Sequence, residues 1–434
     1  MTILLIESMG FTILGPTDPE RLMMAEASKK VIEEHMPTAF VLHMGPNGLG
    51  VTRSLAREGV PVVGVDFVPN APGFFSRYCR PSLCPDPTTD PDGALELLLK
   101  EGEKLPEKGV LYACSDIFVL FVSRNRSALS EHFKFMIPPE EVLEGMINKR
   151  RLYDEAERIG TPYSRTFYPK DWSDLEDIKD RIIFPAFIKP YYSHLWFSRF
   201  NNKGFVVKNY REVVERYKLV FPSGLDAMIQ TIVQGPESNI VTVSTYIGRK
   251  GEPLGAFVHQ KIRQCPKDFG VGSLTKSIHD DNLSSEALRF FREIGYRGIG
   301  SLEFKRDERD GEFRLIELNA RPWLPNVQAT YSGINFPMIQ YLDLLERPVE
   351  PIWDFKDGVR WFDSIGDLES YWAYRKAGSL SFGDWVRSWL GSECHARFAW
   401  DDIRPSLVAA EYGIAYIKLL NRLSKTEKKD RTRT

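Results

Sequence analysis

Charge of one sign is what this sequence most clearly lacks. Its 57 lysines and arginines are balanced by 59 aspartates and glutamates, which gives a net charge of −2 and a pI near 6.4. Without a global basic field the chain does not attract nucleic acid through its net charge, so we expect no nucleic-acid partner. Acidic small molecules would have to be captured by basic residues gathered at one site.

Cysteine is also scarce. The five cysteines are odd in number and widely separated, at Cys79, Cys84, Cys114, Cys265 and Cys394. This pattern favours reduced thiols in a cytoplasmic protein over a disulfide framework. Cys79 and Cys84 could form half of a metal site, but no second pair accompanies them.

Long apolar runs are missing as well. No uninterrupted apolar stretch approaches the roughly 20 residues that a membrane-spanning helix needs. The first residues have no basic region, and Glu7 interrupts their short apolar run, so a signal peptide is not predicted. We expect a cytoplasmic protein without a transmembrane segment.

The chain has 434 residues, 43% of them hydrophobic and 27% charged, which is enough for two or three domains with cores of their own. After an N-terminal segment, 1–38, short apolar strands alternate with helices as far as residue 139, which is typical of an open parallel α/β domain. The strands of this domain are expected at 39–43, 61–66 and 110–115, and the helices at 51–58 and 93–101. A second domain is expected over 140–350 and an extension over 351–434.

Within the second domain a single helix is predicted from Glu140 through Ala156, and antiparallel strands with a few helices follow. The strands are expected at 163–167, 185–189, 204–207, 227–233, 238–247 and 254–263, and the helices at 211–220 and 284–294. Tyr191 to Phe205 is read as a bulky aromatic loop, and Asp268 to Ser273 as a flexible segment that covers the site.

The stretch from Ile299 to Asn319 predicts a metal site. Two runs of alternating apolar and polar residues, 299–305 and 312–318, flank turn residues that end in Asp-Gly, as in a β-hairpin. In the expected register Glu303 lies opposite Leu315 and diagonal to Glu317, and Asn319 points the same way. Two carboxylates and an amide form a hard, oxygen-only ligand set, which suits Mg²⁺ on nucleotide phosphates, with Mn²⁺ as an alternative.

The residues that follow Glu317 also resemble a known pattern. Phe304-Lys305-Arg306-Asp307 and then Glu317-Leu318-Asn319-Ala320-Arg321 are similar to the metal-binding end of the ATP-grasp ligases, in which an acidic strand precedes Glu-x-Asn-x-Arg. From Gly45 to about Leu344 the chain resembles the carboxylate-amine ligases of this superfamily, most closely the D-aspartate ligase-like branch. The resemblance implies a pre-ATP-grasp α/β domain (39–139), an ATP-grasp fold of two α+β subdomains (140–350) and a helical C-terminal extension (351–434).

The same resemblance implies an ATP site. Lys149 and Lys189 stand where these proteins carry two phosphate-contacting lysines. Gln230 and Val233 belong to a strand similar to the hinge that faces adenine, and Glu237 to a Gly-x-Glu whose carboxylate accepts from ribose hydroxyls.

Further basic residues come from the strand at 254–263. Strand parity places His259, Lys261 and Arg263 on one face, where Arg263 could stabilise a transferring phosphoryl group. Alternatively, these three residues form an ordinary charged strand face that is exposed to solvent. His194 and Lys203, in the aromatic loop that replaces the usual glycine-rich flap, are further candidates for phosphate or substrate contact.

A glycine loop raises a rival hypothesis. Gly45-Pro46-Asn47-Gly48-Leu49-Gly50 follows a predicted strand, and Asp66 ends the next, which is the context of a dinucleotide-binding fingerprint. Arg53, however, stands where the third glycine or alanine is required, so an NAD-dependent oxidoreductase is disfavoured. A P-loop kinase is disfavoured too, because no GxxxxGK[ST] is present.

Tryptophan is concentrated toward the C-terminus. Seven of the nine lie from Trp323 onward, Trp385 and Trp389 are one helical turn apart, and a basic run, 425–434, ends the chain. We expect a helical cap folded onto the body. The alternative is a surface helix that makes peripheral contact with a membrane or a lipid-linked substrate.

The predicted function is that of an ATP- and Mg²⁺-dependent ligase. As the resemblance implies, a small carboxylate attacks the γ-phosphate to give an acyl phosphate and ADP, and an amine-bearing acceptor then displaces phosphate. Arg321 would hold the carboxylate or the oxyanion, assisted by Lys189 and Arg263, and Asp116 lies in a stretch typical of the same branch. The alternatives are a kinase on the same fold and a protein that binds nucleotide without turnover.

Overall fold

The computed structural model describes residues 36–408, and the chain divides into two compact units, 1–37 and 38–434. Almost all described residues therefore belong to the second unit. The predicted N-terminal segment, apart from its last three residues, and the basic run at 425–434 lie outside the described residues. The predicted division of the chain at residues 139 and 350 is not tested by this and stays a prediction.

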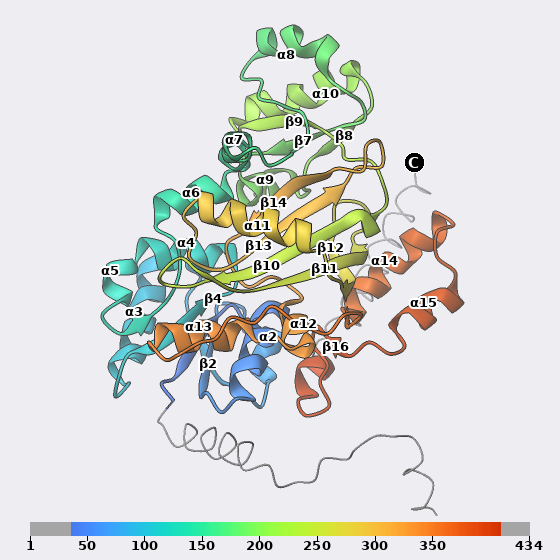
Figure 1. Cartoon of the computed structure of the whole chain (residues 1–434). Helices are drawn as coiled ribbons and strands as arrows, with labels where there is room; N and C mark the ends of the chain where they lie inside the picture. Colours follow the sequence, from blue (N-terminus) through green and yellow to red (C-terminus); the bar gives the residue numbers. More distant parts are fainter. Residues whose placement is uncertain (1–35, 409–434) are drawn as a thin grey trace, which may run out of the picture. The chain divides into compact units, whose positions relative to one another are not determined.

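The first layer is a five-stranded sheet, coloured blue to teal in Figure 1, in which every pairing is parallel. Its strand order is β3-β2-β1-β4-β5, so the chain reverses direction across the sheet between β1 and β4. The strands are β1 (Ala39–Leu42), β2 (Val62–Asp66), β3 (Arg80–Leu83), β4 (Gly109–Ala113) and β5 (Phe133–Lys134). The helices are α2 (Pro46–Ala56), η2 (Pro72–Phe75), α3 (Pro91–Glu103), α4 (Asp116–Arg124) and α5 (Arg126–Leu129).

The helix predicted over 140–156 is two helices, α6 (Glu140–Ile147) and α7 (Lys149–Ile159). Asn148 separates them because its side chain accepts hydrogen bonds from the backbone N–H groups of Arg150 and Arg151 and so caps α7. Lys149 is therefore the first residue of a helix, and Gly160 ends that helix in the left-handed conformation.

A small antiparallel sheet follows, with strand order β6-β9-β7-β8 and helices α8 and α10 on its outer side (Figure 1). The predicted aromatic loop contains a helix, α9, whose Trp196 is fully buried in the core of this sheet. The strands are β6 (Thr166–Phe167), β7 (Ala186–Pro190), β8 (Phe205–Val207) and β9 (Ala227–Thr231). The helices are α8 (Trp172–Ile178), η3 (Lys179–Arg181), α9 (Ser193–Phe200), α10 (Tyr210–Val220) and η4 (Phe221–Ser223).

The largest sheet has seven strands, in the order β14-β13-β10-β11-β12-β15-β16. Its first four strands and α11 supply much of the largest hydrophobic core, which includes Phe257, Phe290 and Leu302. The strands are β10 (Ile240–Ile247), β11 (Pro253–Cys265), β12 (Val271–Ser277), β13 (Gly298–Arg306), β14 (Phe313–Asn319), β15 (Arg360–Phe362) and β16 (Cys394–His395). The helices are η5 (Glu237–Asn239), α11 (Asp281–Glu293), α12 (Asn326–Ser332), α13 (Phe336–Leu344), α14 (Ser364–Lys376) and α15 (Phe382–Trp389).

The C-terminal region combines helices with strands. Helix α14 packs against β11 (Figure 1), and β15 and β16 extend the large sheet beyond β12. Trp385 and Trp389 lie on α15 with ring centroids 5.8 Å apart, as expected for residues one turn apart. The second half of the segment predicted as a flexible cover is instead the start of β12, which begins at Val271.

The register of the hairpin differs from the prediction. A bulge after Glu303 shifts the pairing, so that Glu303 lies directly opposite Glu317, and Phe304 opposite Leu315. Leu315 therefore enters the core, with none of its surface exposed. The extra residue of a bulge takes no partner, and here it brings the two carboxylates closer together than the diagonal arrangement would.

Candidate functional site

Two glutamate–lysine pairs line the hairpin. The Lys261 Nζ lies 2.8 Å from the Glu303 Oε2, and the Lys149 Nζ lies 2.8 Å from the Glu317 Oε1. Lys149 comes from the first turn of α7 and Lys261 from β11, so these two elements meet both strands of the hairpin here. The predicted metal residues Glu303 and Glu317 and the predicted basic residues Lys149 and Lys261 are thus brought together.

Lys189 reaches the same place from the small sheet. It is 7% exposed, and its ammonium donates to the Tyr153 hydroxyl over 2.6 Å. That hydroxyl in turn donates to the carbonyl of Ile316 over 2.8 Å, so Tyr153 joins the second lysine to the metal hairpin. Tyr153 was not among the predicted site residues. Its position four residues after Lys149, on the same helical face, was the available signal.

The pKa values of the charged groups in the site are shifted in different directions. Burial raises the pKa of the Glu317 carboxyl, but Lys149, Lys203 and Lys189 together bring it down to about 2. Burial, with the nearby Lys149 charge, lowers the pKa of Lys189 to about 7. Burial also opposes the charge of Lys149, yet Glu317 raises the pKa of this lysine above its ordinary value. Lys189 is therefore the group that an arriving anion would convert to its charged form near neutral pH.

The predicted nucleotide-base residues border the two sheets. Gln230 is 6% exposed and donates to the Thr166 hydroxyl over 2.8 Å, and Val233 is 5% exposed. The Oε1 of Glu237 is buried and has no hydrogen-bond partner among the described residues. Such an orphaned acceptor is costly unless a donor arrives, and a sugar hydroxyl is a donor of the right kind.

A ring contact also crosses from one sheet to the other. Phe187 of β7 stacks on Phe269, with ring centroids 4.4 Å apart and an angle of 2° between the planes. Phe269 belongs to the short turn between β11 and β12 and is 40% exposed. The turn that precedes β12 therefore does approach the small sheet.

Arg321 lies just beyond the hairpin and is paired with Asp116. Its Nε is 2.6 Å from the Asp116 Oδ1, and its Nη2 is 3.4 Å from the Oδ2. Asp116 begins α4 directly after β4, and His43 at the end of β1 has both Arg321 and Asp116 among its charged neighbours. Arg321 and the carboxyl ends of β1 and β4 thus meet where the strand order of the parallel sheet reverses, which is where ligands bind in open α/β sheets.

Arg263 has a different partner from the one predicted. Its Nε and Nη2 each lie 2.8 Å from a carboxylate oxygen of Asp367 on α14, and both side chains are buried. Register shifts on both sides of Arg263 disturb the simple alternation on which the prediction relied. The guanidinium therefore holds the C-terminal region against β11 and is not free to meet a phosphate.

The aromatic loop contributes one described candidate. Lys203 is exposed and has Glu317 and Glu303 among its charged neighbours. The side chain of His194 lies outside the described part of the structure. His259, on the same strand as Lys261, is 3% exposed, and burial and the Lys261 charge lower its pKa to about 3, so it is neutral.

The glycine loop makes contacts within the protein. A side chain at Gly50 would lie 2.7 Å from the Asn326 Oδ1. Arg53, the residue at the third fingerprint position, is 3% exposed and bonds the carboxylate of Asp402 over 3.0 Å. The loop is thus close-packed against α12, and Arg53 holds the C-terminal segment.

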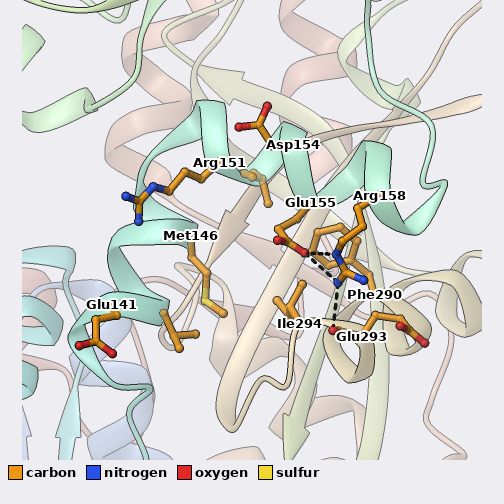
Figure 2. Close-up of a pocket in the computed structure, with 11 residues that line it drawn as sticks. Glu141, Met146, Arg151, Asp154, Glu155, Arg158, Phe290, Glu293 and Ile294 are labelled. Carbon is orange, nitrogen blue, oxygen red and sulfur yellow. Dashed lines mark hydrogen bonds and ion pairs between the residues drawn. The ribbon is translucent and has the colours of Figure 1, made fainter.

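One cavity of the described residues lies apart from this site. A cavity of about 470 Å³ lies between α6, α7 and α11, and Figure 2 shows Met146, Phe290 and Ile294 among the residues that line it. It is on the other side of α7 from Lys149 and Tyr153, whose partners are on β14 and β7. Its charged residues include Arg158, which bonds Glu155 and the carbonyl of Glu293 (Figure 2). The predicted site residues Glu303, Glu317, Lys149 and Lys261 converge at the hairpin and not at this cavity.

The hairpin fits a magnesium ion bound together with phosphates. Among the described residues no group of three or more His, Cys, Asp or Glu side chains gathers, so the protein does not supply a complete cage. Mg²⁺ does not require one, because it is usually bound through one or two carboxylates, water and substrate phosphates. Glu303 and Glu317, on directly paired positions, together with Asn319, have this composition.

No helix of the described residues has the length and apolarity to cross a membrane.

Comparison with known proteins finds similarity in sequence and in fold. The family described as "Carbamoyl-phosphate synthase L chain, ATP binding domain" matches residues 273–325, the segment that contains the hairpin. D-aspartate ligase of Enterococcus faecium (strain Aus0004) is 23% identical over 278 residues, which is 61% of this chain and 66% of the relative. The match thus spans just under two thirds of that relative's length.

Three solved structures share the fold. Biotin carboxylase from Campylobacter jejuni has a TM-score of 0.59 and 17% identity, over 74% of each chain. N5-carboxyaminoimidazole synthetase from Staphylococcus aureus complexed with ADP has a TM-score of 0.58 and 12% identity, over 75% of this chain and 80% of that chain. L-amino acid ligase from Bacillus licheniformis has a TM-score of 0.53 and 17% identity, over 73% of this chain and 76% of that chain. The expected architecture, an open parallel α/β layer followed by an ATP-grasp fold, is thereby confirmed. The chain is thus similar in sequence to D-aspartate ligase and shares the ATP-grasp fold with these solved structures.

Proposed function

We propose that this protein is an ATP- and Mg²⁺-dependent ligase that activates a carboxylate as an acyl phosphate and joins it to an amine. The observation that carries the proposal is the pair of opposed carboxylates, Glu303 and Glu317, each held by a lysine at 2.8 Å. The ligases among the relatives support the same class of reaction, and the name of the Enterococcus relative suggests an amino acid such as D-aspartate as the carboxylate.

In the first step the chain's own residues offset the charge of the transferring phosphoryl group. Glu303, Glu317 and Asn319 would hold Mg²⁺, which offsets charge on the phosphates when it is bound. Lys149 and Lys261, released from the two glutamates, would contact phosphate oxygens. Lys189, with its pKa of about 7, would become fully charged when the nucleotide arrives. Glu237 supplies a buried acceptor for a ribose hydroxyl.

The proposed reaction exchanges bonds in two steps. An oxygen of the carboxylate attacks the γ-phosphorus, the bond to the bridging oxygen breaks, and ADP leaves. The amine nitrogen then attacks the acyl carbon, loses its extra protons, and orthophosphate leaves. Arg321, next to the hairpin, is placed to hold the carboxylate and then the oxyanion of the tetrahedral intermediate. Arg263 has no part in this scheme because Asp367 occupies it.

The products test the mechanism. A ligase of this kind yields ADP and orthophosphate, hydroxylamine traps the acyl phosphate as a hydroxamate, and oxygen-18 from the carboxylate appears in the released phosphate. Lys189→Ala should suppress the hydroxamate and the labelled phosphate, because a lysine directed at phosphate contributes most as charge moves. Formation of AMP, or label that stays wholly in the amide, would rule the mechanism out even if ATP bound. ADP formation with phosphate on a hydroxyl would indicate a kinase.

A further inference from the structure

His43 directly follows β1 in a backbone conformation that a histidine seldom adopts. Its φ is 78°, in the left-handed region, which is costly for a residue with a Cβ. The N–H of His43 still donates to the carbonyl of Val65 over 2.8 Å, so the regular pairing of the sheet extends as far as this residue. Strained conformations of this kind persist where the surrounding structure holds them, and they gather at functional sites.

A buried carboxylate lies beside the imidazole of His43. The Nδ1 of the ring is 3.5 Å from the Oδ2 of Asp66, which ends β2 and is fully buried. The Asp66 carboxylate is itself fixed by the backbone N–H groups of Met44 and Val68, over 2.6 and 3.1 Å. A fixed carboxylate at this position favours the tautomer with its hydrogen on Nδ1, which leaves the lone pair on Nε2.

Gly45 leaves the space that the ring occupies. A Cβ on residue 45 would lie 2.5 Å from the Nε2 of His43 and 3.0 Å from its Cε1, and its three nearest atoms all belong to the imidazole. The backbone of Gly45, with φ −65° and ψ −173°, is one that any residue can adopt. The start of the glycine loop is therefore shaped around this imidazole, of which 31% remains exposed.

Charged groups from three further elements face His43. They are Asp66 on β2, Asp116 on α4 and Arg321 beyond β14, and the side chain of Asn47 on α2 is a hydrogen-bonding neighbour. Burial, aided by Arg321, lowers the pKa of His43 below its ordinary value, although the two aspartates and Asn47 raise it. The imidazole is therefore neutral at pH 7 and able to accept a proton.

The position suits the second step of the proposed reaction. His43 and Asp116 follow the neighbouring parallel strands β1 and β4, where the strand order reverses. Arg321, the residue proposed to hold the oxyanion, pairs with Asp116 from the hairpin side. Because phosphate leaves toward the hairpin, an acceptor amine reaches the acyl carbon from the side of the parallel sheet. Lys189, whose pKa is about 7, becomes charged beside the phosphates and cannot take up another proton.

We propose that His43 is the general base that takes a proton from the acceptor amine in the second step, with Asp66 as its positioning residue. The inference rests on the proposed function and adds the group that deprotonates the second substrate. The amine arrives as an ammonium ion, and one proton passes to the imidazole and then to water. The nitrogen lone pair forms the C–N bond, and the C–O bond breaks with its electrons on phosphate. The second proton lost from nitrogen converts that phosphate to hydrogen phosphate.

Two small acceptors separate this role from the first step. Hydroxylamine is uncharged at neutral pH and attacks an acyl phosphate without a base, whereas an ammonium ion has first to lose a proton. The full-length protein is supplied with ATP, Mg²⁺, hydroxylamine and each of a panel of carboxylates, namely the twenty L-amino acids, D-aspartate, D-alanine, succinate and acetate. The carboxylate that gives most hydroxamate is then combined with ammonium chloride, and the carboxamide is measured by mass spectrometry. The quantity compared is the ratio of the carboxamide rate to the hydroxamate rate.

Two variants remove the base in different ways. His43→Asn removes the imidazole and keeps a residue that tolerates the left-handed conformation. Gly45→Ala keeps His43 and displaces its ring. The matched controls are His132→Asn, directly before β5, and Gly383→Ala on α15, where a Cβ would meet nothing within 4 Å.

At pH 7 we expect the ratio to fall by at least about 100-fold in His43→Asn, as for loss of a general base, and by at least about tenfold in Gly45→Ala. Both controls should stay within about twofold of the parent. The difference between the parent and His43→Asn should shrink as the pH rises, because free ammonia then becomes abundant. A loss that is equal at every pH would indicate a structural role and overturn the inference.

The remaining outcomes separate the inference from the proposed function. A ratio in His43→Asn within about threefold of the parent overturns the inference, while the hydroxamate itself upholds the proposed function. Hydroxamate without any carboxamide in the parent has the same meaning. If His43→Asn forms no hydroxamate, Gly45→Ala decides, and an unchanged ratio there overturns the inference. No hydroxamate from any carboxylate with the parent overturns both.

Discussion

The carboxylates of the hairpin and those that fix the C-terminal region are held in different ways. Glu303 and Glu317 each have one lysine as their ion-pair partner among the described residues. Asp367 instead accepts two hydrogen bonds from Arg263 and one each from Ser273 and Trp385. It is fully buried, whereas the Glu317 side chain is 41% exposed.

Asp402 repeats the second arrangement. Its carboxylate accepts from Arg53, from the Ser76 hydroxyl and from the backbone N–H of Arg77, and it is 3% exposed. A buried carboxylate that accepts three or four hydrogen bonds has little capacity left for a ligand and is costly to disturb. One held by a single lysine can exchange that partner. The number of partners thus separates the groups that hold the protein together from those that can bind a nucleotide and its metal.

The largest effect on stability is expected at Asp367. Asp367→Asn removes the charge that offsets the buried guanidinium of Arg263 and should lower the free energy of unfolding by about 3–5 kcal/mol, the usual result of breaking a buried pair. Chemical denaturation followed by tryptophan fluorescence measures it. If the double variant Arg263→Met, Asp367→Leu is no more stable than Asp367→Asn, the loss does not come from the unpaired charge.

Glu317→Gln, in contrast, should reduce activity strongly and stability only slightly. It keeps the volume of the side chain and removes a charge from a partly exposed site, so stability should change by less than about 1 kcal/mol. Mg²⁺-dependent ATP turnover should fall by at least about 100-fold, because a hard cation loses an anionic ligand. Turnover within about threefold of the parent would mean that the hairpin is not the metal site.

The pKa of Lys189 predicts a pH dependence of nucleotide affinity. With a pKa of about 7 in the free protein, Lys189 is mostly charged at pH 6 and mostly neutral at pH 8. Phosphate binds the charged form, so ATP affinity should fall by up to about tenfold per pH unit above pH 7 until the pKa of the bound form is reached. Calorimetry with a non-hydrolysable ATP analogue measures it. In Lys189→Arg, whose guanidinium does not titrate, a slope as steep as in the parent would assign it to another group.

Much of the architecture could be predicted because it follows local rules. The parallel strands β1, β2 and β4, the core strands and the hairpin all follow apolar periodicity and turn residues, which act over short distances. The break at Asn148 was missed although an asparagine that caps a helix is a local signal. Helix α9 was missed because its aromatic residues, of which Trp196 is fully buried, resembled those of a loop.

Partners far apart in the sequence could not be predicted. Arg263 and Asp367 are 104 residues apart, and Arg53 and Asp402 are 349 apart. Strand parity gave Lys261 the correct face, since it meets Glu303, but the bulges near Arg263 and after Glu303 lie beyond what alternation can show. A bulge depends on how three-dimensional packing resolves a mismatch between neighbouring strands, and no single strand encodes it.

The smallest effect is expected from nicotinamide cofactors, which should not bind. The glycine loop has the context of a dinucleotide fingerprint, but, like Asp402, it is already in contact with other parts of the protein. Gly50 is packed against Asn326, and Arg53 is buried in its ion pair with Asp402. Calorimetry of the parent with NAD and NADP should therefore give no heat of binding, with MgADP as the positive control. Micromolar affinity for either cofactor would show that the loop remains open to a ligand. The number of hydrogen-bond partners would then not distinguish Asp402 from the carboxylates that can exchange their partner.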